Sequence, residues 1–197
     1  MDDNQSFAAI VVGSSAGGIR ALSTLLTSLP GDFPLPIIIV QHVQPDADSY
    51  LATILDKRSA LTVKQADDKE FIHKGTVYLA PPNYHLLIEE DRSFSLSLEG
   101  LVNFSRPSID VLFESAVYAY RNQLIGIILT GANHDGSQGL KKIKQFGGYA
   151  IVQDPDTAEA DAMPRSAIAA TKVDKILPVE RIGGYLLRLL GIFAKMG

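Results

Sequence analysis

The feature that most constrains the fold is a series of short apolar segments that alternate with longer segments of helical periodicity. The apolar segments have the length of strands and carry almost no polar residue. A strand that is apolar on both faces has to be covered on both faces, as in parallel sheets whose strands are joined by helices. We therefore predict an α/β domain with a doubly wound, mostly parallel sheet and helices on both faces. The predicted strands are residues 7–12, 37–41, 124–129 and 149–153.

Helices are predicted in the segments between these strands. In residues 17–29 the apolar side chains recur at the spacing of one helical face, and Pro30-Gly31 ends the pattern. Residues 108–120 follow the same series, with Ser108 in position to cap the first turn. The apolar positions of the first helix are Ile19, Leu22, Leu25, Leu26 and Leu29. The remaining predicted helices are residues 46–57, 138–145, 164–170 and 179–194, the last of them interrupted at Gly183-Gly184.

Residues 61–98 show a different pattern, in which apolar and polar residues alternate over short stretches. We interpret this region as a small β-rich insertion of extended strands and loops with an antiparallel hairpin. A chain of 197 residues is long enough to bury roughly 70% of its unfolded surface around one core. No repeat or low-complexity segment divides it, so we predict that residues 1–197 form a single domain.

Composition excludes several classes of function. With 18 basic and 22 acidic residues and no run of Lys or Arg, the chain lacks the pattern that binds nucleic-acid backbones. The absence of Cys excludes disulfides, thiol catalysis and thiolate metal sites. The four His residues lack the spacing of metal ligands, so no metal is expected, and His73 and His85 fit ordinary strand or surface positions.

The chain also lacks the signals that would direct it to a membrane. The first residues carry no positive charge, as a signal peptide would. The longest apolar runs fall far short of the roughly 18 residues that a membrane span needs. We therefore expect a cytoplasmic protein that is not embedded in a membrane.

The candidate site follows from the residues that come directly after the predicted strands. In open parallel sheets, ligands bind beyond the carboxyl ends of the strands. Ser15 follows the first strand in a glycine-rich turn, His42 follows the second strand, and Asp135 lies in the loop after the third. These are the nucleophile, the base and the orienting carboxylate of a serine hydrolase. The helix that begins beyond Ser15 offers backbone N–H groups where an oxyanion would form.

Each of these positions also has another interpretation. Residues 13–18 fit a phosphate-binding or purely structural turn, although they lack the spacing of G-x-G-x-x-G and the Lys-Ser/Thr of a P-loop. Ser14 is the alternative nucleophile, and His134 is the alternative base. Asp135 precedes a glycine and is also placed to cap the next helix.

The segments around these positions resemble the catalytic domain of the chemotaxis protein-glutamate methylesterases, the enzymes that demethylate bacterial chemoreceptors. The matches occur in the same order along nearly the whole chain, which makes them far more specific than any single motif. They are Val12-Gly13-Ser14-Ser15-Ala16-Gly17-Gly18, Gln41-His42, residues 78–85, residues 106–113, residues 129–136, and Gln153-Asp154-Pro155 through Ala162-Met163-Pro164.

The resemblance implies a Rossmann-like fold and hydrolysis without a cofactor, with Ser15 as nucleophile, His42 as base and Asp135 as the third member. It implies that the substrate is a methylated chemoreceptor-type protein, whose glutamate methyl esters become glutamate and methanol. Related enzymes also deamidate receptor glutamines. The backbone near Ala16 and Ala132 is expected to bind the oxyanion. Residues 61–98 and the segment that contains Arg106 are expected either to line the substrate cleft or to form packed loops.

Two departures from the family pattern bear on function. Regulated members carry an N-terminal receiver domain with a phosphorylatable Asp, whereas only a few residues precede the first predicted strand here. We therefore expect a stand-alone catalytic domain, for which a separate phosphorylated receiver protein is the candidate regulator. Ala132 stands where the family often has Met, and Ala16 stands where many relatives have a hydroxyl residue. The pocket near the oxyanion is expected to differ accordingly.

The sequence thus favours a serine hydrolase of the protein-glutamate methylesterase type. One alternative is a non-catalytic module that binds receptors or signalling partners. Another is a nucleotide-binding domain, which the glycine spacing disfavours. Because a histidine base has to be neutral to accept a proton, we expect hydrolysis to rise from acid toward neutral pH.

Overall fold

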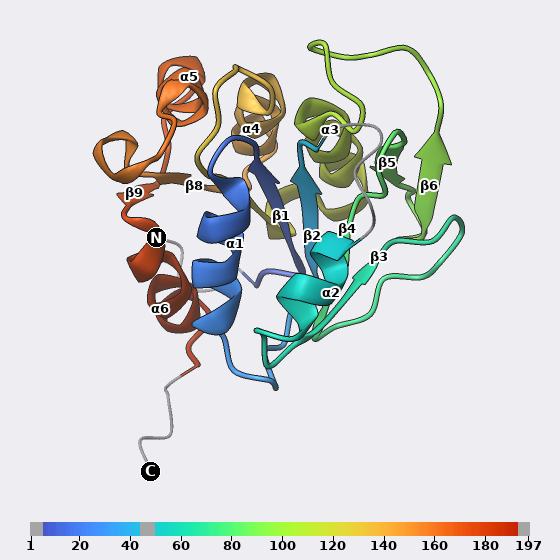
Figure 1. The fold of residues 1–197 in the computed structure, drawn as a ribbon, viewed down its shortest axis with the longest axis horizontal. Coiled ribbons are helices and arrows are strands. Elements are labelled where there is room, and N and C mark those ends of the chain that lie inside the picture. Colours follow the sequence, from blue (N-terminus) through green and yellow to red (C-terminus); the bar gives the residue numbers. More distant parts are fainter. Residues whose placement is uncertain (1–5, 44–49, 193–197) are drawn as a thin grey trace.

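The computed structural model describes residues 6–43 and 50–192, and its core is a parallel sheet of seven strands (Figure 1). The strand order is β3-β4-β2-β1-β7-β8-β9, and every neighbouring pair is parallel. From the central β1 the chain first extends to one side through β2 and later to the other through β7. Ligands bind at such a reversal, beyond the carboxyl ends of the strands. The strands are β1 (Ala9–Ser14), β2 (Ile37–Gln41), β3 (Thr62–Gln65), β4 (Thr76–Leu79), β7 (Leu124–Ile128), β8 (Tyr149–Gln153) and β9 (Lys175–Leu177).

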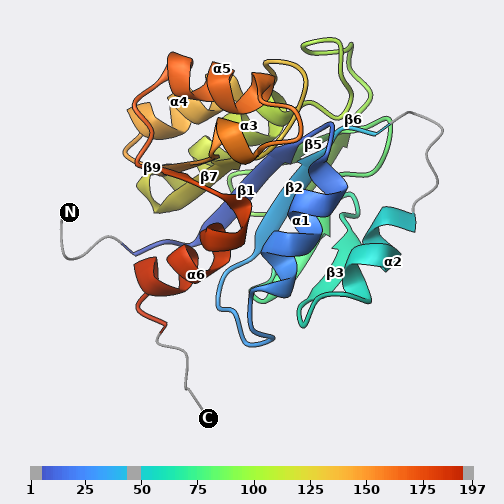
Figure 2. The ribbon, with the colours of Figure 1, turned by 60° about the vertical axis from the view of Figure 1, so that its left-hand side comes forward.

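Helices cover both faces of the sheet, as Figures 1 and 2 show. Alternate residues of β1 face the two helical layers. Ile10 and Val12 join the core beneath α1, whereas Ala9 and Val11 join the core beneath α3, and all four are fully buried. This double burial explains why the strand is apolar at every position. One layer contains α1 (Gly18–Thr27), α2 (Tyr50–Asp56) and α6 (Val179–Leu189), and the other contains α3 (Ile109–Tyr120), α4 (Ser137–Gln145) and α5 (Ala162–Ala170).

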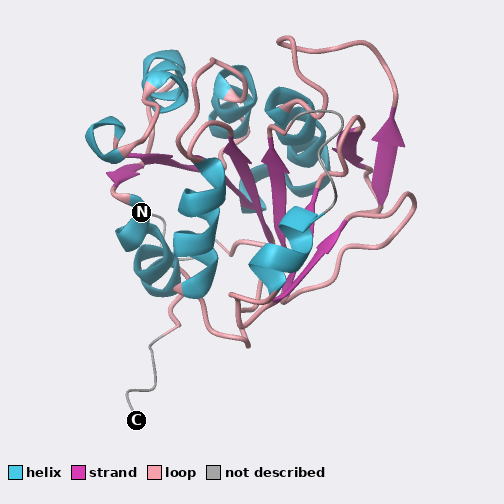
Figure 3. Ribbon diagram, viewed as in Figure 1, coloured by secondary structure: helices cyan, strands magenta, loops and turns pink. Residues whose placement is uncertain are grey.

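A two-stranded antiparallel hairpin lies beside the main sheet (Figure 3). It consists of β5 (His85–Ile88) and β6 (Phe94–Ser97), and it packs against α3. Short 3-10 turns occur at η1 (Arg121–Gln123) and η2 (Pro155–Thr157). The predicted doubly wound fold with a small β-rich insertion is therefore confirmed.

The insertion is smaller than the region that the sequence suggested. Within residues 61–98, β3 and β4 join the main sheet as parallel strands, and only the later part forms the hairpin. The buried run Val77-Tyr78-Leu79 has the two-sided apolar character of a central strand, which its short length obscured. The strand β9 was not predicted, because its three residues begin with Lys175 and carry no periodic signal.

Three predictions for the helices need correction or lie partly outside the described residues. Ile19, expected on the buried side of α1, is 47% exposed, and the buried positions include Gly18 and Ala21 instead. Of the predicted helix 46–57, the structure describes α2 (Tyr50–Asp56), and residues 46–49 lie outside the described residues. The predicted helix 179–194 was too long, because α6 ends at Leu189 and Gly191 adopts a left-handed φ of 67°; Ala194 lies outside the described residues.

The predicted interruption of the last helix at Gly183-Gly184 was wrong, because α6 runs continuously through both residues. Gly183 serves close packing of α6 against α1, since a Cβ at this position would lie 1.9 Å from Ser28 Oγ. Among the residues that the structure describes, no helix is long and apolar enough to cross a membrane.

Candidate active site

Three loops at the carboxyl edge of the sheet bring Ser15, His42 and Asp135 into one region. Ser15 directly follows β1, His42 directly follows β2, and Asp135 lies in the loop between β7 and α4. The Ser15 N–H donates to the Thr130 carbonyl at 2.9 Å, and the His42 N–H donates to the Ser14 carbonyl at 3.0 Å. Backbone hydrogen bonding thus continues past the strand ends and holds the loops relative to one another.

The turn after β1 is built on two glycines. Gly17 adopts a φ of 75°, in the left-handed region that glycine enters without a steric penalty. Gly18 leaves no room for a side chain, because a Cβ there would lie 1.9 Å from Gln41 Oε1. Gln41 Nε2 also donates to the Ser15 carbonyl at 2.9 Å. The amide of Gln41 therefore braces the turn that presents Ser15.

The two neighbouring serines have different environments. Ser14 is fully buried and donates its hydroxyl to Gln41 Oε1 at 2.7 Å. Ser15 lines an open cleft. Because a nucleophile has to reach its substrate, this difference favours Ser15 over Ser14.

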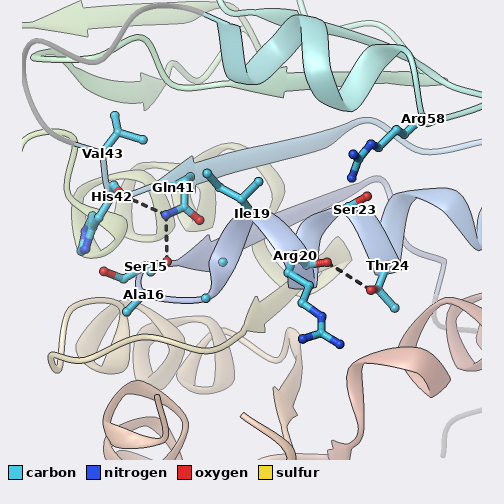
Figure 4. Close-up of a pocket in the computed structure, with 12 residues that line it drawn as sticks. Ser15, Ala16, Ile19, Arg20, Ser23, Thr24, Gln41, His42, Val43 and Arg58 are labelled. Carbon is cyan, nitrogen blue, oxygen red and sulfur yellow. Dashed lines mark hydrogen bonds between the residues drawn. The ribbon is translucent and has the colours of Figure 1, made fainter. Parts of the chain in front are cut away.

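His42 is hydrogen-bonded through both ring nitrogens. Its Nε2 lies 2.9 Å from Asp135 Oδ2, and its Nδ1 lies 3.1 Å from Asn133 Nδ2. A carboxylate only accepts, so Nε2 carries the proton and Nδ1 carries the lone pair that a base needs. Within the described part of the chain, Ser15 Oγ makes no hydrogen bond with this ring, but both side chains line the same cleft (Figure 4).

The structure does not bring His134 to the site. Its side chain is exposed and makes no hydrogen bond with any other described residue. His73 is exposed as well. His85 is buried in β5, where its Nε2 lies 2.9 Å from the Gly100 carbonyl and its Nδ1 accepts from the Ser108 N–H at 3.2 Å. These contacts give His85 a structural role.

Asp135 is buried within a shell of hydrogen-bond donors. Its Oδ2 accepts from the Ile109 N–H at 2.6 Å, in addition to His42. Its Oδ1 accepts from Ser108 Oγ at 2.9 Å and from Asn103 Nδ2 at 2.8 Å. Ser108 occupies the predicted N-cap position of α3 but uses its hydroxyl for Asp135 rather than for a cap. The start of a helix favours an anion, so α3 supports the carboxylate. The N–H groups of Asp110 and Gly136 also donate to Oδ1, at 3.2 and 3.1 Å.

The pKa values of two neighbouring buried carboxyl groups, those of Asp135 and Asp110, are shifted in opposite directions. Burial by itself would raise the pKa of Asp135, but hydrogen bonds from His42, Asn103 and the backbone of α3 outweigh burial and lower the pKa below its ordinary value of 3.8. Burial raises the pKa of Asp110, and the charge of Asp135 adds to this effect, despite a hydrogen bond from the Gly139 N–H at 2.6 Å. Asp135 is therefore held as an anion, which is the form that orients a histidine base.

The lowered pKa of Asp135 predicts an acid-dependent loss of stability. The unfolded chain binds a proton at this group more readily than the folded chain. The stabilisation is therefore complete above the ordinary value of 3.8 and is lost as pH falls through the lower folded-state pKa. Asp135→Asn removes the group that takes up this proton. As pH is lowered from about 5 to about 3, the Tm of the variant should therefore fall less steeply than the Tm of the wild type.

Thermal unfolding followed by circular dichroism at several pH values measures this difference. Asp32→Asn is the matched control, because Asp32 is exposed and makes no side-chain hydrogen bond with the described residues. We expect this control to follow the wild-type slope. Equal slopes for wild type and Asp135→Asn would contradict the prediction.

Ser15 and His42 line one end of a cleft of about 1050 Å³ that extends along α1 (Figure 4). Ile19 and Val43 supply apolar surface in this cleft, which gives the exposed position of Ile19 a role. Arg58 lines the cleft far from Ser15, beyond the end of α2. The cleft is open enough to admit an extended part of a large substrate.

Two backbone N–H groups near Ser15 remain available. Ala16 directly follows Ser15 and lines the cleft, and Ala132 lies in the loop that carries Asp135. Both residues are exposed, and neither N–H donates a hydrogen bond within the described ranges. Such groups are suited to an oxyanion.

Arg106 does not line this cleft. Its guanidinium donates to Asn83 Oδ1 at 2.8 Å and to the carbonyls of Leu98 and Glu99 at 2.8 and 2.9 Å. These contacts brace the loop between β6 and α3. A substrate contact for Arg106 stays a prediction, and the structure gives its side chain a structural role.

The structure adds Gln41, Asn103 and Asn133 to the site. Gln41 carried a visible signal, as a polar residue at the end of an apolar strand. Asn103 and Asn133 lie in loops without periodicity, and no sequence pattern connects them to the other site residues. In the described residues, no group of three or more His, Cys, Asp or Glu side chains is arranged to hold a metal ion.

Comparisons with known proteins agree with this geometry. The family model for the CheB methylesterase matches residues 10–186. A Leptospira interrogans protein is provisionally named a protein-glutamate methylesterase/protein-glutamine glutaminase. It is 57% identical over 93% of this chain and 95% of its own length. The protein-glutamate methylesterase/protein-glutamine glutaminase of Thermotoga maritima is 38% identical over 92% of this chain, which spans 54% of that relative. The solved catalytic domain of the Thermotoga maritima CheB methylesterase matches with a TM-score of 0.89 and 38% identity, over 93% of this chain and 99% of that structure.

Proposed function

The chain belongs to the CheB methylesterase family, and from this premise we propose that it hydrolyses glutamate methyl esters on chemoreceptor-type proteins, with Ser15, His42 and Asp135 as its catalytic triad. The observation that carries the proposal is the His42–Asp135 pair, 2.9 Å apart, in the same cleft as Ser15. Curated relatives named for both activities support a second reaction of the same kind, the deamidation of glutamine side chains.

In the first step, Ser15 Oγ attacks the side-chain carbonyl carbon of the methylated glutamate. The Oγ–H bond breaks, and the proton passes to His42 Nδ1, while Nε2–H stays on Asp135. The carbonyl oxygen becomes an oxyanion, which the N–H of Ala16 and an N–H near Ala132 stabilise. One such donor contributes about 2.7–4 kcal/mol to the stability of the transition state.

The tetrahedral intermediate then collapses and the ester C–O bond breaks. Methanol leaves with the proton from Nδ1, and an acyl-enzyme on Ser15 remains. Water attacks this acyl group and gives a proton to Nδ1, after which the proton returns to Ser15 Oγ and the receptor chain leaves with a free glutamate side chain. With a glutamine substrate, ammonia leaves in place of methanol. No step of this proposed reaction uses a cofactor.

The substrate and its control follow from the same proposal. The substrate is a methylated chemoreceptor-type protein, and the open cleft along α1 receives the part of its chain next to the modified glutamate. Residues 1–197 act as one catalytic domain in the cytoplasm. A separate phosphorylated receiver protein is the candidate regulator.

Covalent labelling with a fluorophosphonate tests the proposed triad. In intact-mass spectrometry we expect one adduct on the wild type and on Ser14→Ala, and none on Ser15→Ala or His42→Ala, because only an activated Ser15 attacks the phosphorus atom. Circular dichroism checks that each variant is folded. Methanol release from methylated receptors then identifies the substrate. A folded wild-type protein that forms no adduct at any pH would overturn the proposal and favour a non-catalytic binding module.

A further inference from the structure

Asn133 contacts two members of the proposed triad with opposite ends of its side-chain amide. Its Oδ1 accepts from the Asp135 N–H at 3.0 Å, and its Nδ2 lies 3.1 Å from His42 Nδ1. A backbone N–H only donates, so the amide oxygen has to face Asp135. The amide NH₂ group therefore has to face His42 Nδ1.

This orientation restricts the protonation of the imidazole ring. An NH₂ group only donates, so Nδ1 accepts from it through a lone pair and carries no proton in the resting site. The Asp135 carboxylate accepts at Nε2, on the other side of the ring. Asn133 and Asp135 thus favour the same neutral tautomer from opposite sides, and Asp135 is the charged side chain bonded to this ring within the described residues.

The nitrogen that Asn133 occupies is also the one that the proposed reaction uses. When the Ser15 Oγ–H bond breaks, its proton forms a new bond with Nδ1. A protonated Nδ1 has no lone pair left for the Asn133 amide, and two donors then face each other. The amide has to give way at this step, and until then it opposes protonation of the ring.

We propose that Asn133 is a positioning residue that holds His42 in its Nε2–H tautomer and releases Nδ1 when Ser15 transfers its proton. This inference rests on the proposed function for the role of His42 as base. It does not depend on that function for the tautomer itself, which can be measured directly in the resting protein.

Long-range proton–nitrogen NMR correlations of the His42 ring test the tautomer at neutral pH. The wild type is expected to show a protonated Nε2 and an unprotonated Nδ1. Asn133→Asp keeps an acceptor for the Asp135 N–H but presents a carboxylate oxygen to Nδ1, so the Nδ1–H form should appear. His134→Ala is the matched control, because this exposed neighbour in the same loop makes no side-chain hydrogen bond with the described residues. It should keep the wild-type pattern.

The pH profile of hydrolysis tests the catalytic consequence, with p-nitrophenyl acetate as a small ester that does not need the whole cleft. On the pH plateau, Asn133→Ala should not lower kcat, because the bond from the amide to Nδ1 is present in the resting site and broken when Nδ1 takes the proton, and KM should change little. The acid limb of the pH–rate profile of Asn133→Ala should move to higher pH, because the amide no longer opposes protonation of the His42 ring. Asn133→Asp should move the limb further. A merely structural role would lower activity equally at all pH values.

Unchanged ring correlations in Asn133→Asp, together with an unmoved acid limb in both variants, would overturn the inference. Fluorophosphonate labelling tests the proposed function independently of the ring correlations. If the wild type forms no fluorophosphonate adduct while the ring correlations change as expected, the serine hydrolase proposal fails and Asn133 remains the residue that sets the tautomer of His42.

Discussion

We expect Ser15→Ala to lower kcat for glutamate methyl ester hydrolysis by about 10⁶-fold, the scale of loss when the nucleophile of a serine hydrolase is removed. The substitution deletes the atom that forms the acyl-enzyme, and Ser14 cannot replace it. The Ser14 hydroxyl is buried and donates to Gln41 Oε1 at 2.7 Å, away from the cleft. Methanol release from a methylated receptor measures the effect, with a single-turnover assay to reach the low rates.

Stability provides the control for this variant. Within the described residues, the Ser15 hydroxyl makes no hydrogen bond, so its removal should leave Tm nearly unchanged. A large drop in Tm would mean that activity was lost through unfolding. A folded Ser15→Ala protein with more than a tenth of the wild-type kcat would remove Ser15 from the role of nucleophile.

Asp135→Asn should reduce kcat by about 10⁴-fold, the loss observed when the orienting carboxylate of a Ser-His-Asp triad becomes an amide. The groups around Asp135 are all donors, including His42 Nε2, Ser108 Oγ and Asn103 Nδ2. The new side-chain NH₂ group would face the donors at Oδ1 in one orientation. In the other orientation it would face His42 Nε2, which would then have to accept a hydrogen bond from it. In the second case the proton moves to Nδ1, where it blocks transfer from Ser15.

This variant is also expected to lose stability at neutral pH, because a buried amide NH₂ without an acceptor costs about 1–3 kcal/mol. Kinetics therefore have to be measured on protein whose circular dichroism and thermal transition show that it is folded. The double variant Ser15→Ala, Asp135→Asn should be no slower than Ser15→Ala, because members of a triad act as one unit. A folded Asp135→Asn protein within threefold of the wild-type kcat would exclude Asp135 from the triad.

The predicted parts of the fold are those in which local pattern and tertiary environment agree. β2 and β8 have the predicted limits, because Pro36 and Gly148 directly precede their apolar runs and each run ends at a buried Gln. The helix α3 begins one residue after Ser108, as the helical periodicity and its capping residue indicate. In contrast, Ile19 has the right spacing for the core of α1 but lies in the cleft, and periodicity cannot distinguish a core face from a cleft face.

The sequence by itself determined that β1, β2, β7 and β8 are covered on both faces, and it predicted that Ser15, His42 and Asp135 lie at the same edge of the sheet. Those features depend on hydrophobic burial and chain direction, which short segments encode locally. Only the tertiary structure decided that Ser14 is buried, that Arg106 braces a loop, and which ring nitrogen faces Asp135. It alone brought Asn103 to Asp135 and Asn133 to His42. Hydrogen bonds between loops distant in sequence depend on orientation to within a few tenths of an ångström, and no local periodicity records that orientation.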